Sequence, residues 1–388
     1  MLTRTFQELE LSQLGFGAMR LPLLPDGQVD EAQVREMVAD AMAQGVNYFD
    51  TAYPYHRGDS ERVMGRVLGA YPRESYCLAT KFPGHQICET YDPEAIFEEQ
   101  LQKCGVTYFD FYLLHNVYEH SLATYTDARW NIVPYLIEQK RRGRIRHLGF
   151  SSHGGLEVLE RFLDLYGQEM EFCQIQLNYL DWTLQNARAK YELLTRRGVP
   201  VWVMEPVRGG RLASLTPEQT RRLSALRPDA TPAEWAFRFL QELPNVTMIL
   251  SGMSDRQQMR ENLATFAKAR PLLPAERETL LALAEEMKAG VPCTACRYCC
   301  DGCPRGLEIP LMLEVYNELQ TAPSVNASMR IEALPPLRQP SACIGCGKCA
   351  QVCPQGIDIP RRLRELADLL TRLPTWAEVC RQRAKEQR

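Results

Sequence analysis

The sequence predicts an α/β protein in two parts: a (β/α)8 barrel, followed by a smaller and mainly α-helical part that is rich in cysteine. Two observations favour the barrel: short apolar segments alternate with amphipathic ones, and eight such units fit into the first two thirds of the chain. The third observation is that nine of the 14 cysteines fall between Cys293 and Cys353. We therefore predict a barrel domain over residues 1–270 and a second domain over residues 271–388.

The eight predicted strands are almost continuously apolar, which is typical of parallel strands covered on both faces by helices. Between them lie amphipathic stretches; in the first, four apolar residues recur at the i, i+3, i+4, i+7 spacing of one helix face, and Gly45 follows as a stop signal. No GxGxxG motif follows the first strand, which disfavours an open dinucleotide-binding sheet. The strands are expected at residues 14–19, 46–49, 76–80, 109–114, 145–150, 172–177, 199–204 and 246–250.

The composition is that of a globular protein, with 45% apolar and 24% charged residues among 388. The charges nearly balance, with a formal net charge of -3, so nothing indicates a nucleic-acid partner. The first residues lack the features of a secretory signal, and no apolar run is long enough to cross a membrane. We therefore expect a cytoplasmic protein without a membrane partner, in which clustered cysteines bind metal rather than form disulfides.

Polar residues follow several of the predicted strands, where a barrel of this type carries its chemistry. Asp50, Lys81 and His115 end three successive strands, so their side chains are expected to meet at one mouth of the barrel. Tyr55 lies five residues after Asp50, on a loop that can fold over the same mouth. The alternative is a structural ion pair with a packed tyrosine and a buried histidine.

These four residue types suit the reduction of a carbonyl group, which needs an acid to protonate the developing alkoxide. A free tyrosine has a pKa of about 10, and the ammonium group of Lys81 is expected to lower the pKa of Tyr55. Asp50 would hold Lys81 charged and in place. His115 could donate a hydrogen bond to the carbonyl oxygen and orient it.

The segments GVNYFDTAYPYHRGDSERVMG, ATKFP, YLLHN and GFSSHG resemble the aldo-keto reductase superfamily, and the resemblance extends from about residue 5 to residue 266. It implies that Asp50, Tyr55, Lys81 and His115 are the catalytic residues, with Tyr55 as the general acid. It also implies a small-molecule carbonyl or alcohol substrate and a nicotinamide cofactor, NADPH or NADH, bound without a glycine-rich loop.

The resemblance further implies which residues contact the cofactor, with Ser151 and Gln174 holding its carboxamide. Two positions depart from the family pattern: Met204 stands where an aromatic ring often stacks on the nicotinamide, and Gln258 stands where an arginine often binds the 2′-phosphate. The resemblance implies NADPH rather than NADH, and Arg256 or Arg260 could replace the missing arginine, with a solvated helix face as their alternative role, so the choice between the two cofactors stays open. The cofactor-contacting positions are Gly17, Ser151, Gln174, Met204, Gln258, Glu261 and Asn262.

The cysteine-rich part contains two runs with the identical spacing C-x2-C-x2-C-x3-C-P, which is the ferredoxin pattern for [4Fe–4S] clusters. Zinc is the alternative, but zinc sites typically use pairs of C-x2-C rather than quartets that end in proline. We predict two clusters with crossed ligands, because the fourth cysteine of each run usually ligates the other cluster. The two ligand sets are Cys293, Cys296, Cys299 and Cys353, and Cys343, Cys346, Cys349 and Cys303.

The two parts together suggest an oxidoreductase that transfers hydride between NAD(P)H and a carbonyl or alcohol, with clusters that serve electron transfer or structure. An electron-transfer partner protein is then conceivable. The alternative is an iron–sulfur electron-transfer protein that uses the barrel as a docking scaffold. We expect Tyr118, Tyr125 and Trp130 as candidate pocket aromatics, and the polar end RQRAKEQR as a solvated tail.

Overall fold

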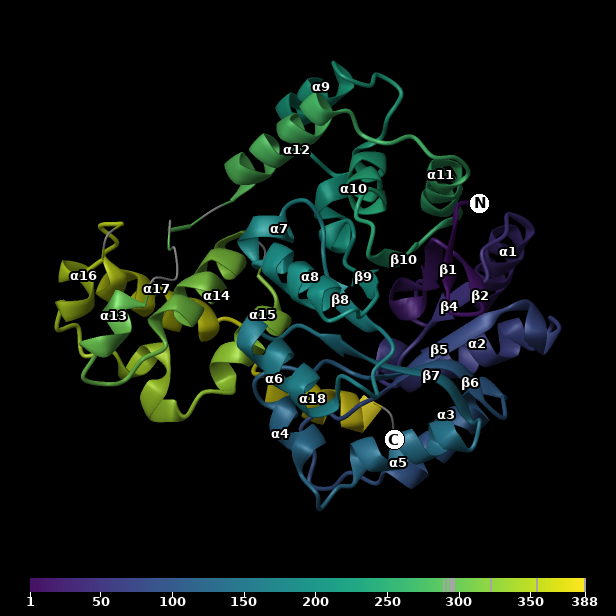
Figure 1. Cartoon of the computed structure of the whole chain (residues 1–388), viewed down its shortest axis with the longest axis horizontal. Helices are drawn as coiled ribbons and strands as arrows, with labels where there is room; N and C mark the ends of the chain where they lie inside the picture. The colour runs from purple at the N-terminus through teal and green to yellow at the C-terminus, as the bar shows by residue number, and fades with distance from the viewer. Residues whose placement is uncertain (289, 292, 294–296, 322, 354, 387–388) are drawn as a thin grey trace.

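The computed structural model describes the chain except for residues 289, 292, 294–296, 322, 354 and 387–388. Eight parallel strands close into a barrel in the order β10-β3-β4-β5-β6-β7-β8-β9. This confirms the predicted (β/α)8 barrel, and each expected strand is present (Figure 1). The strands are β3 (Leu14–Gly17), β4 (Tyr48–Asp50), β5 (Cys77–Phe82), β6 (Phe109–Leu114), β7 (Ile145–Ser152), β8 (Cys173–Gln176), β9 (Val201–Met204) and β10 (Val246–Ser251).

Helices surround the barrel and bury one apolar face each against it. In α1 (Glu31–Ala43) the buried residues are the four at helical spacing: Val34, Met37, Val38 and Ala41. The other surrounding helices are α2 (Ser60–Leu68), α3 (Pro93–Cys104), α5 (Ile132–Arg141), α6 (Leu156–Tyr166), α8 (Ala187–Arg196), α10 (Pro232–Gln241) and α11 (Arg256–Phe266). Shorter helices, α4 (Ser121–Thr126), α7 (Asp181–Leu184) and α9 (Pro217–Ser224), lie in the loops.

An antiparallel hairpin of β1 (Thr3–Phe6) and β2 (Leu9–Ser12) closes the bottom of the barrel. Phe6 inserts its ring among aromatic side chains inside the barrel and meets Trp202 edge-on, with 5.0 Å between the ring centroids. Trp202 is fully buried. Because this end is plugged, the carboxyl ends of the strands form the open end of the barrel, where enzymes of this fold carry their sites.

The C-terminal part forms a separate, helical lobe with its own apolar core, as predicted (Figure 1). The helix α12 (Pro274–Met287) connects it to the barrel. Several of the cysteines pack against the lobe core, so residues predicted as metal ligands also belong to its interior. The helices of the lobe are α13 (Tyr298–Asp301), α14 (Ile309–Thr321), α15 (Val325–Glu332), α16 (Lys348–Gln351) and α17 (Ile359–Leu370). None of the helices in the described parts of the chain is long and apolar enough to span a bilayer.

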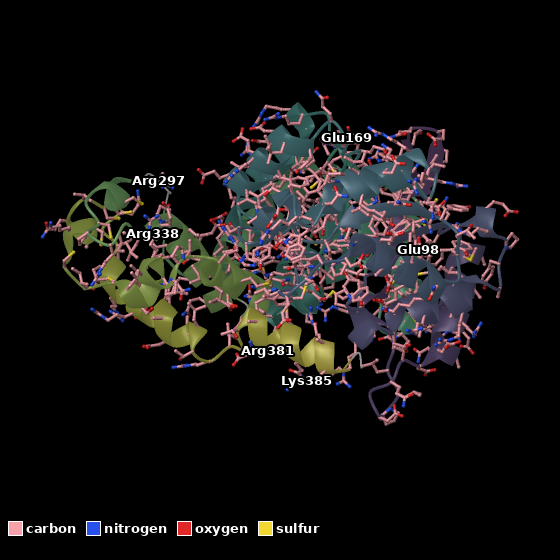
Figure 2. All side chains as sticks on the ribbon, turned by 90° about the horizontal axis from the view of Figure 1, so that it is seen from below. Glu98, Glu169, Arg297, Arg338, Arg381 and Lys385 are labelled. Carbon is pink, nitrogen blue, oxygen red and sulfur yellow. The ribbon has the colours of Figure 1, made fainter. Side chains whose placement is uncertain are left out.

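The last helix, α18 (Trp376–Glu386), leaves the lobe and lies against the barrel (Figure 1). The expectation that residues 381–388 form a solvated, frayed tail is wrong in two respects: residues 381–386 continue the helix, and Arg383 is half-buried, whereas the other five described residues of this segment are exposed as expected. Trp376, Cys380 and Arg383 stand at i, i+4 and i+7, so they share one helix face; the first two are buried and Arg383 is half-buried. Figure 2 shows Arg381 and Lys385 on the outer side of this helix. This apolar face is short, but it is enough to dock the helix although most residues of the segment are polar.

A buried ion network joins the lobe to the barrel around Arg330, whose side chain is 4% exposed. Its guanidinium lies 3.3 Å from Glu119 of the barrel, 3.1 Å from Glu314 and 3.3 Å from Glu318. Burial alone lowers the pKa of Arg330, but the three carboxylates outweigh it and raise that pKa. Burial raises the pKa of Glu318 to about 7. The network thus has one guanidinium in contact with three acids, and the buried Lys190 acts on Glu314 and Glu318 as a second cation from further away.

Replacing Arg330 by methionine is expected to destabilise the lobe by about 3–5 kcal/mol, because the carboxylates of Glu314 and Glu318 lose their buried partner. Urea unfolding followed by circular dichroism measures the effect. Arg338→Met is the matched control, since Arg338 is exposed and is expected to change stability by less than about 0.5 kcal/mol. Equal unfolding midpoints for both variants would show that the network contributes nothing.

Candidate active site and iron–sulfur region

The four predicted catalytic residues come together at the open end of the barrel. Lys81 in β5 is fully buried, and its Nζ donates to Asp50 Oδ1 at 2.5 Å and to the Thr51 carbonyl at 2.8 Å. The Lys81 Nζ lies 5.1 Å from the centroid of the Tyr55 ring. The rings of Tyr55 and His115 meet edge-on at 6.0 Å. The strand register explains the arrangement, since β4, β5 and β6 are neighbours in the sheet.

The loop that carries Tyr55 has an unusual backbone. Tyr55 begins a short 3-10 segment, Tyr55–Gly58, in which His56 and Arg57 have left-handed φ angles of 48° and 57°. Left-handed φ angles are uncommon for residues other than glycine and persist only where the surroundings hold them. One such contact is visible, because His56 Nε2 accepts a hydrogen bond from the Leu21 amide at 3.1 Å. This conformation fixes where the Tyr55 hydroxyl can point.

The electrostatics of the site are dominated by burial. Burial raises the pKa of Tyr55, while the Lys81 ammonium acts to lower it, and the net direction is upward. The direction is opposite to the one expected from sequence, because full burial of the phenol outweighs the single charge of Lys81. Burial also raises the pKa of Asp50 against the opposing effect of Lys81. Burial lowers the pKa of Lys81, but Asp50 and Tyr55 outweigh it and raise that pKa.

Three histidines face the site, of which only His115 was predicted. Burial lowers the pKa of His85 to about 3 and that of His153 to about 4, and it holds the pKa of His115 well below its ordinary value. All three are therefore neutral near pH 7 and add no positive charge. His85 packs closely against His115, with 4.1 Å between ring centroids and the ring planes tilted by 52°. His85 and His153 were not predicted, although each closely follows the end of a strand, a position that indicates residues at the open end of the barrel.

A cavity of about 390 Å³ opens at this end of the barrel and contains Asp50, Tyr55 and His115 in its wall. Every residue predicted to contact the cofactor also lines it, which places seven positions from distant parts of the sequence around one space. These residues are Gly17, Ser151, Gln174, Met204, Gln258, Glu261 and Asn262.

The cavity wall fits a nicotinamide cofactor. Gln174 Oε1 is buried and has no hydrogen-bond partner among the described residues, so it is available to accept from a carboxamide. At Gly17 a β-carbon would stand 3.2 Å from the Ser251 carbonyl oxygen and narrow the cavity at that point. Asn262 Nδ2 donates to Ser251 Oγ at 3.0 Å, which fixes α11 to the end of β10. The hydrogen-bond donors and acceptors in the cavity wall are therefore compatible with a nicotinamide cofactor.

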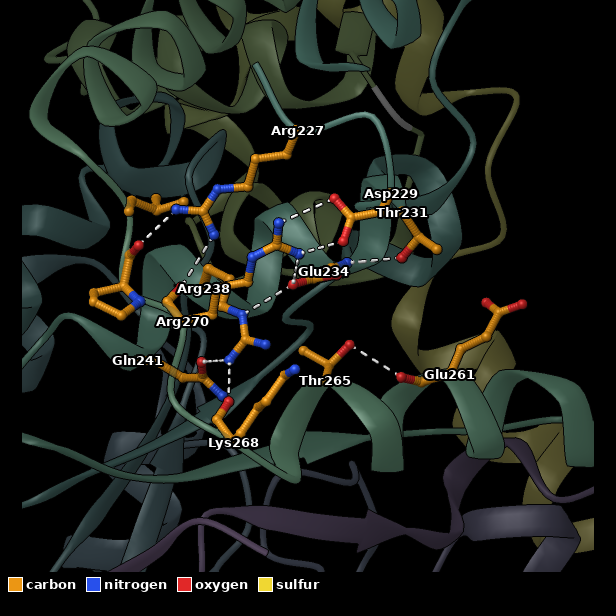
Figure 3. A network of polar contacts seen from close by, with 12 residues as sticks. Arg227, Asp229, Thr231, Glu234, Arg238, Gln241, Glu261, Thr265, Lys268 and Arg270 are labelled. Carbon is orange, nitrogen blue, oxygen red and sulfur yellow. Dashed lines mark hydrogen bonds and ion pairs between the residues drawn. The ribbon is translucent and has the colours of Figure 1, made fainter. Parts of the chain in front are cut away.

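The helix α11, which carries three of these residues, is anchored to α10 by a polar network (Figure 3). Arg238 donates to the Lys268 carbonyl at 2.9 Å, just beyond the end of α11, and to Gln241 Oε1 at 2.8 Å. Arg270 pairs with Asp229 at 3.0 Å. The network holds the far end of α11, so the residues of its first turns keep their place against the cavity.

The C-terminal lobe supplies part of the cavity wall through Asn326, Trp376 and Arg383. Trp376 Nε1 donates to the His85 carbonyl at 2.9 Å, and its ring stacks on that of His85 with 5.5 Å between centroids. The aromatics that the sequence suggested for the pocket, Tyr118, Tyr125 and Trp130, are not among the lining residues. No sequence pattern predicts Trp376 at the cavity, because only the docking of α18 brings it there.

In the lobe, four cysteines from both runs line one cavity together with Ile309 and Leu363. Cys303 of the first run joins three cysteines of the second, which is the combination of the crossed assignment. Gly345 and Gly347 adopt φ angles of 69° and 76°, so the chain turns tightly between the ligand positions. The four cysteines are Cys303, Cys343, Cys346 and Cys349.

The other predicted ligand set is visible only in part, because Cys296 lies outside the described residues. Cys299 belongs to the lobe core, and Cys293 and Cys353 are partly buried and pack against it. Within the described residues, no three side chains of the metal-binding types gather tightly enough to hold a single metal ion. A tight group of this kind is what a zinc site needs, whereas a polynuclear cluster needs thiolates spaced around a cavity.

Comparisons with known proteins agree with these features. The model of the aldo/keto reductase family matches residues 13–283, and that of the 4Fe-4S dicluster domain matches residues 291–357. The NADH-specific methylglyoxal reductase of Escherichia coli is 25% identical over 305 residues, which covers 67% of this chain and 91% of that protein. The L-galactose dehydrogenase of Arabidopsis thaliana is 26% identical, covering 70% of this chain and 89% of its own.

Among solved structures, an aldo-keto reductase from Bacillus halodurans in its holo form superposes with a TM-score of 0.59 at 25% identity, covering 73% of this chain and 96% of that one. The family match covers well over half of the sequence, and the barrel agrees with the fold of that structure. The chain therefore belongs to the aldo/keto reductase family, and a 4Fe-4S dicluster domain follows its barrel.

Proposed function

We propose that this oxidoreductase reduces a small-molecule carbonyl compound with NADH, and that Tyr55 is its general acid. The observation that carries the proposal is the position of the buried Lys81–Asp50 pair beside Tyr55. Tyr55 and His115 line the same cavity as the seven residues suited to a nicotinamide. The alternative, an electron-transfer protein with the barrel as a docking scaffold, leaves this arrangement without a role.

The mechanism follows from the protonation states of the chain's own groups. His115 is neutral, so its ring N–H can donate to a carbonyl oxygen without competing as an acid. Tyr55 keeps its proton at neutral pH and can transfer it to that oxygen. The Lys81 ammonium stabilises the phenolate that remains, and Asp50 keeps Lys81 charged and in position. A reduced nicotinamide, when bound with its carboxamide at Ser151 and Gln174, would supply the hydride.

The preference for NADH rests on the first turn of α11. Its only cation, Arg256, is engaged by Glu36 at 2.7 Å and by Asp40 at 3.0 Å. The side chain of Asp255 caps the helix by accepting from the Gln258 amide, and Gln258 Oε1 accepts from the Ser254 amide at 2.9 Å. Arg260, the other candidate cation of α11, is exposed in the next turn and does not line the cavity. A 2′-phosphate would therefore meet a carboxylate and no unpaired cation on the first turn.

The test is a screen of aldehydes and ketones with NADH and with NADPH, using full-length protein purified without oxygen. We expect binding of both cofactors by quenching of tryptophan fluorescence. NADH should bind about 10-fold or more tightly than NADPH, which corresponds to the free energy of one charge-assisted hydrogen bond. Absence of nicotinamide binding would overturn the proposal, and a preference for NADPH would overturn the part that concerns the 2′-phosphate.

We also propose that the lobe holds two [4Fe–4S] clusters, with the crossed ligand sets given above. Chemical analysis of anaerobic protein should then find about eight iron atoms per chain, and about four in Cys346→Ala. Cys300→Ala is the matched control, because Cys300 adjoins the ligand Cys299 but stands outside both sets. Equal iron loss in the two variants would contradict the assignment.

A further inference from the structure

The helix α18 brings a guanidinium group into the catalytic cavity. Arg383 lines this space together with Tyr55 and His115, although the lobe that delivers it follows the barrel in the chain. Its charge is felt at the site, since it contributes to lowering the pKa of both His85 and His115. Arg383 therefore lies within electrostatic reach of the groups that act on the carbonyl.

The other charged groups at the cavity have partners. Asp50 is paired with Lys81, Arg20 lies 3.9 Å from Glu205, and Glu261 accepts from Gln257 Nε2 at 3.0 Å. Arg383 has no carboxylate within ion-pair distance in the described part of the chain, and its guanidinium lies over the Trp376 ring at 5.0 Å. Burial lowers the pKa of Arg383 without removing its charge at neutral pH. The Glu386 carboxylate acts on the pKa of Arg383 from beyond ion-pair distance and is itself paired with Arg57, so Arg383 can still take an anion in direct contact.

The helix is fixed at both ends of this face. Trp376 is held by its hydrogen bond to the His85 carbonyl, and Glu386 pairs with Arg57 at 3.2 Å. Arg57 belongs to the same segment as Tyr55, so this contact ties the end of α18 to the loop that carries the proposed acid. Arg383 lies between these two contacts, and the Tyr55 phenol acts on the pKa of Arg383, so the two side chains are electrostatic neighbours in the cavity.

We propose that Arg383 binds the carboxylate of the substrate, so that the substrate class is carbonyl compounds that carry a carboxylate. A single guanidinium matches the single charge and planar shape of a carboxylate. A phosphate carries nearly two charges at neutral pH, and the described cavity wall offers no second unpaired cation to match it. The inference rests on the proposed carbonyl reduction and adds the recognition of an anionic group.

The experiment compares straight-chain ω-oxo acids with the matching unsubstituted aldehydes as substrates of the full-length, cluster-loaded protein. In Arg383→Gln, we expect kcat/KM for the oxo acids to fall about 100-fold, the value of two charge-assisted hydrogen bonds, while that for the plain aldehydes changes less than about 3-fold. Arg381→Gln is the matched control, since Arg381 lies on the exposed side of the same helix (Figure 2). It should leave both values unchanged.

Equilibrium binding separates this inference from the proposed function. Without cofactor, ω-hydroxy acids should bind the wild-type protein and Arg381→Gln equally, and Arg383→Gln about 100-fold more weakly, as measured by calorimetry. Equal binding to all three proteins, or tighter binding of inorganic phosphate than of the hydroxy acids, would overturn the inference. If the wild type reduced neither class of aldehyde, the proposed function would fail, and the binding data would still decide the role of Arg383.

Discussion

Replacing Tyr55 by phenylalanine is expected to lower carbonyl reduction by about 10²–10⁴-fold, the usual contribution of a general acid. The ring remains, so its packing beside His115 and the shape of the cavity are preserved. Affinity for NADH is therefore expected to stay within about 3-fold of the wild type, because the hydroxyl group alone is lost. Steady-state kinetics and fluorescence titration with the cofactor measure the two effects separately.

Tyr53→Phe provides the matched control, because the Tyr53 hydroxyl donates to Glu99 at 3.0 Å and its side chain does not line the cavity. The pH profile gives a second criterion. Burial raises the pKa of Tyr55 above its ordinary value of about 10, so the protonated acid is present at neutral pH and reduction falls only above that pKa. Alcohol oxidation needs the phenolate and should rise with pH. A Tyr55→Phe enzyme with wild-type turnover would eliminate Tyr55 as the acid.

Replacing Lys81 by methionine is expected to reduce both turnover and stability. The change leaves the buried Asp50 carboxylate without its partner, which typically costs about 3–5 kcal/mol of unfolding free energy. It also removes the cation that stabilises the Tyr55 phenolate, so reduction should fall about 100-fold or more. Urea unfolding and steady-state kinetics measure the two losses.

The loss of stability in Lys81→Met should depend on pH in a defined direction. Without Lys81, burial raises the pKa of Asp50 further above the value of about 3.9 in the unfolded chain. The folded variant then retains a proton that the unfolded chain releases, so its deficit is small near pH 4 and grows as pH rises through the folded pKa. The double variant Asp50→Asn/Lys81→Met should recover stability but not activity. A deficit that does not change with pH would contradict the buried-pair interpretation.

The sequence predicts the barrel and the positions of Asp50, Lys81 and His115 well, because strands and their ends are encoded by local apolar patterns. The cysteine runs are equally local, and their spacing alone suggests the ligands. The direction of the Tyr55 pKa shift could not be predicted, because it depends on how completely the folded protein buries the ring. Burial is a property of the packed tertiary structure and not of spacing along the chain.

Trp376 and Arg383 illustrate the other limit. Their segment is short and mostly polar, and only two residues of α18, Trp376 and Cys380, are buried, so composition suggested a solvated end. Their place in the cavity depends on the interface that Arg330 stabilises between lobe and barrel, roughly fifty residues before Arg383. Contacts between segments that are distant in sequence leave no periodic pattern, so a single sequence cannot reveal them.

The route of the chain from lobe to barrel gives the iron–sulfur part a second consequence. α18 follows α17 directly, and cysteines lie in the lobe core or pack against it, so we expect loss of that core to disturb the placement of Trp376 and Arg383 at the mouth of the barrel. Oxidative damage to the cysteines would then reduce the selectivity of the barrel for its substrate, even if no electron passed between the two parts. If the proposed carbonyl reduction and the proposed clusters both hold, iron supply and oxygen exposure would affect catalysis in the barrel, although none of the proposed catalytic residues is a metal ligand.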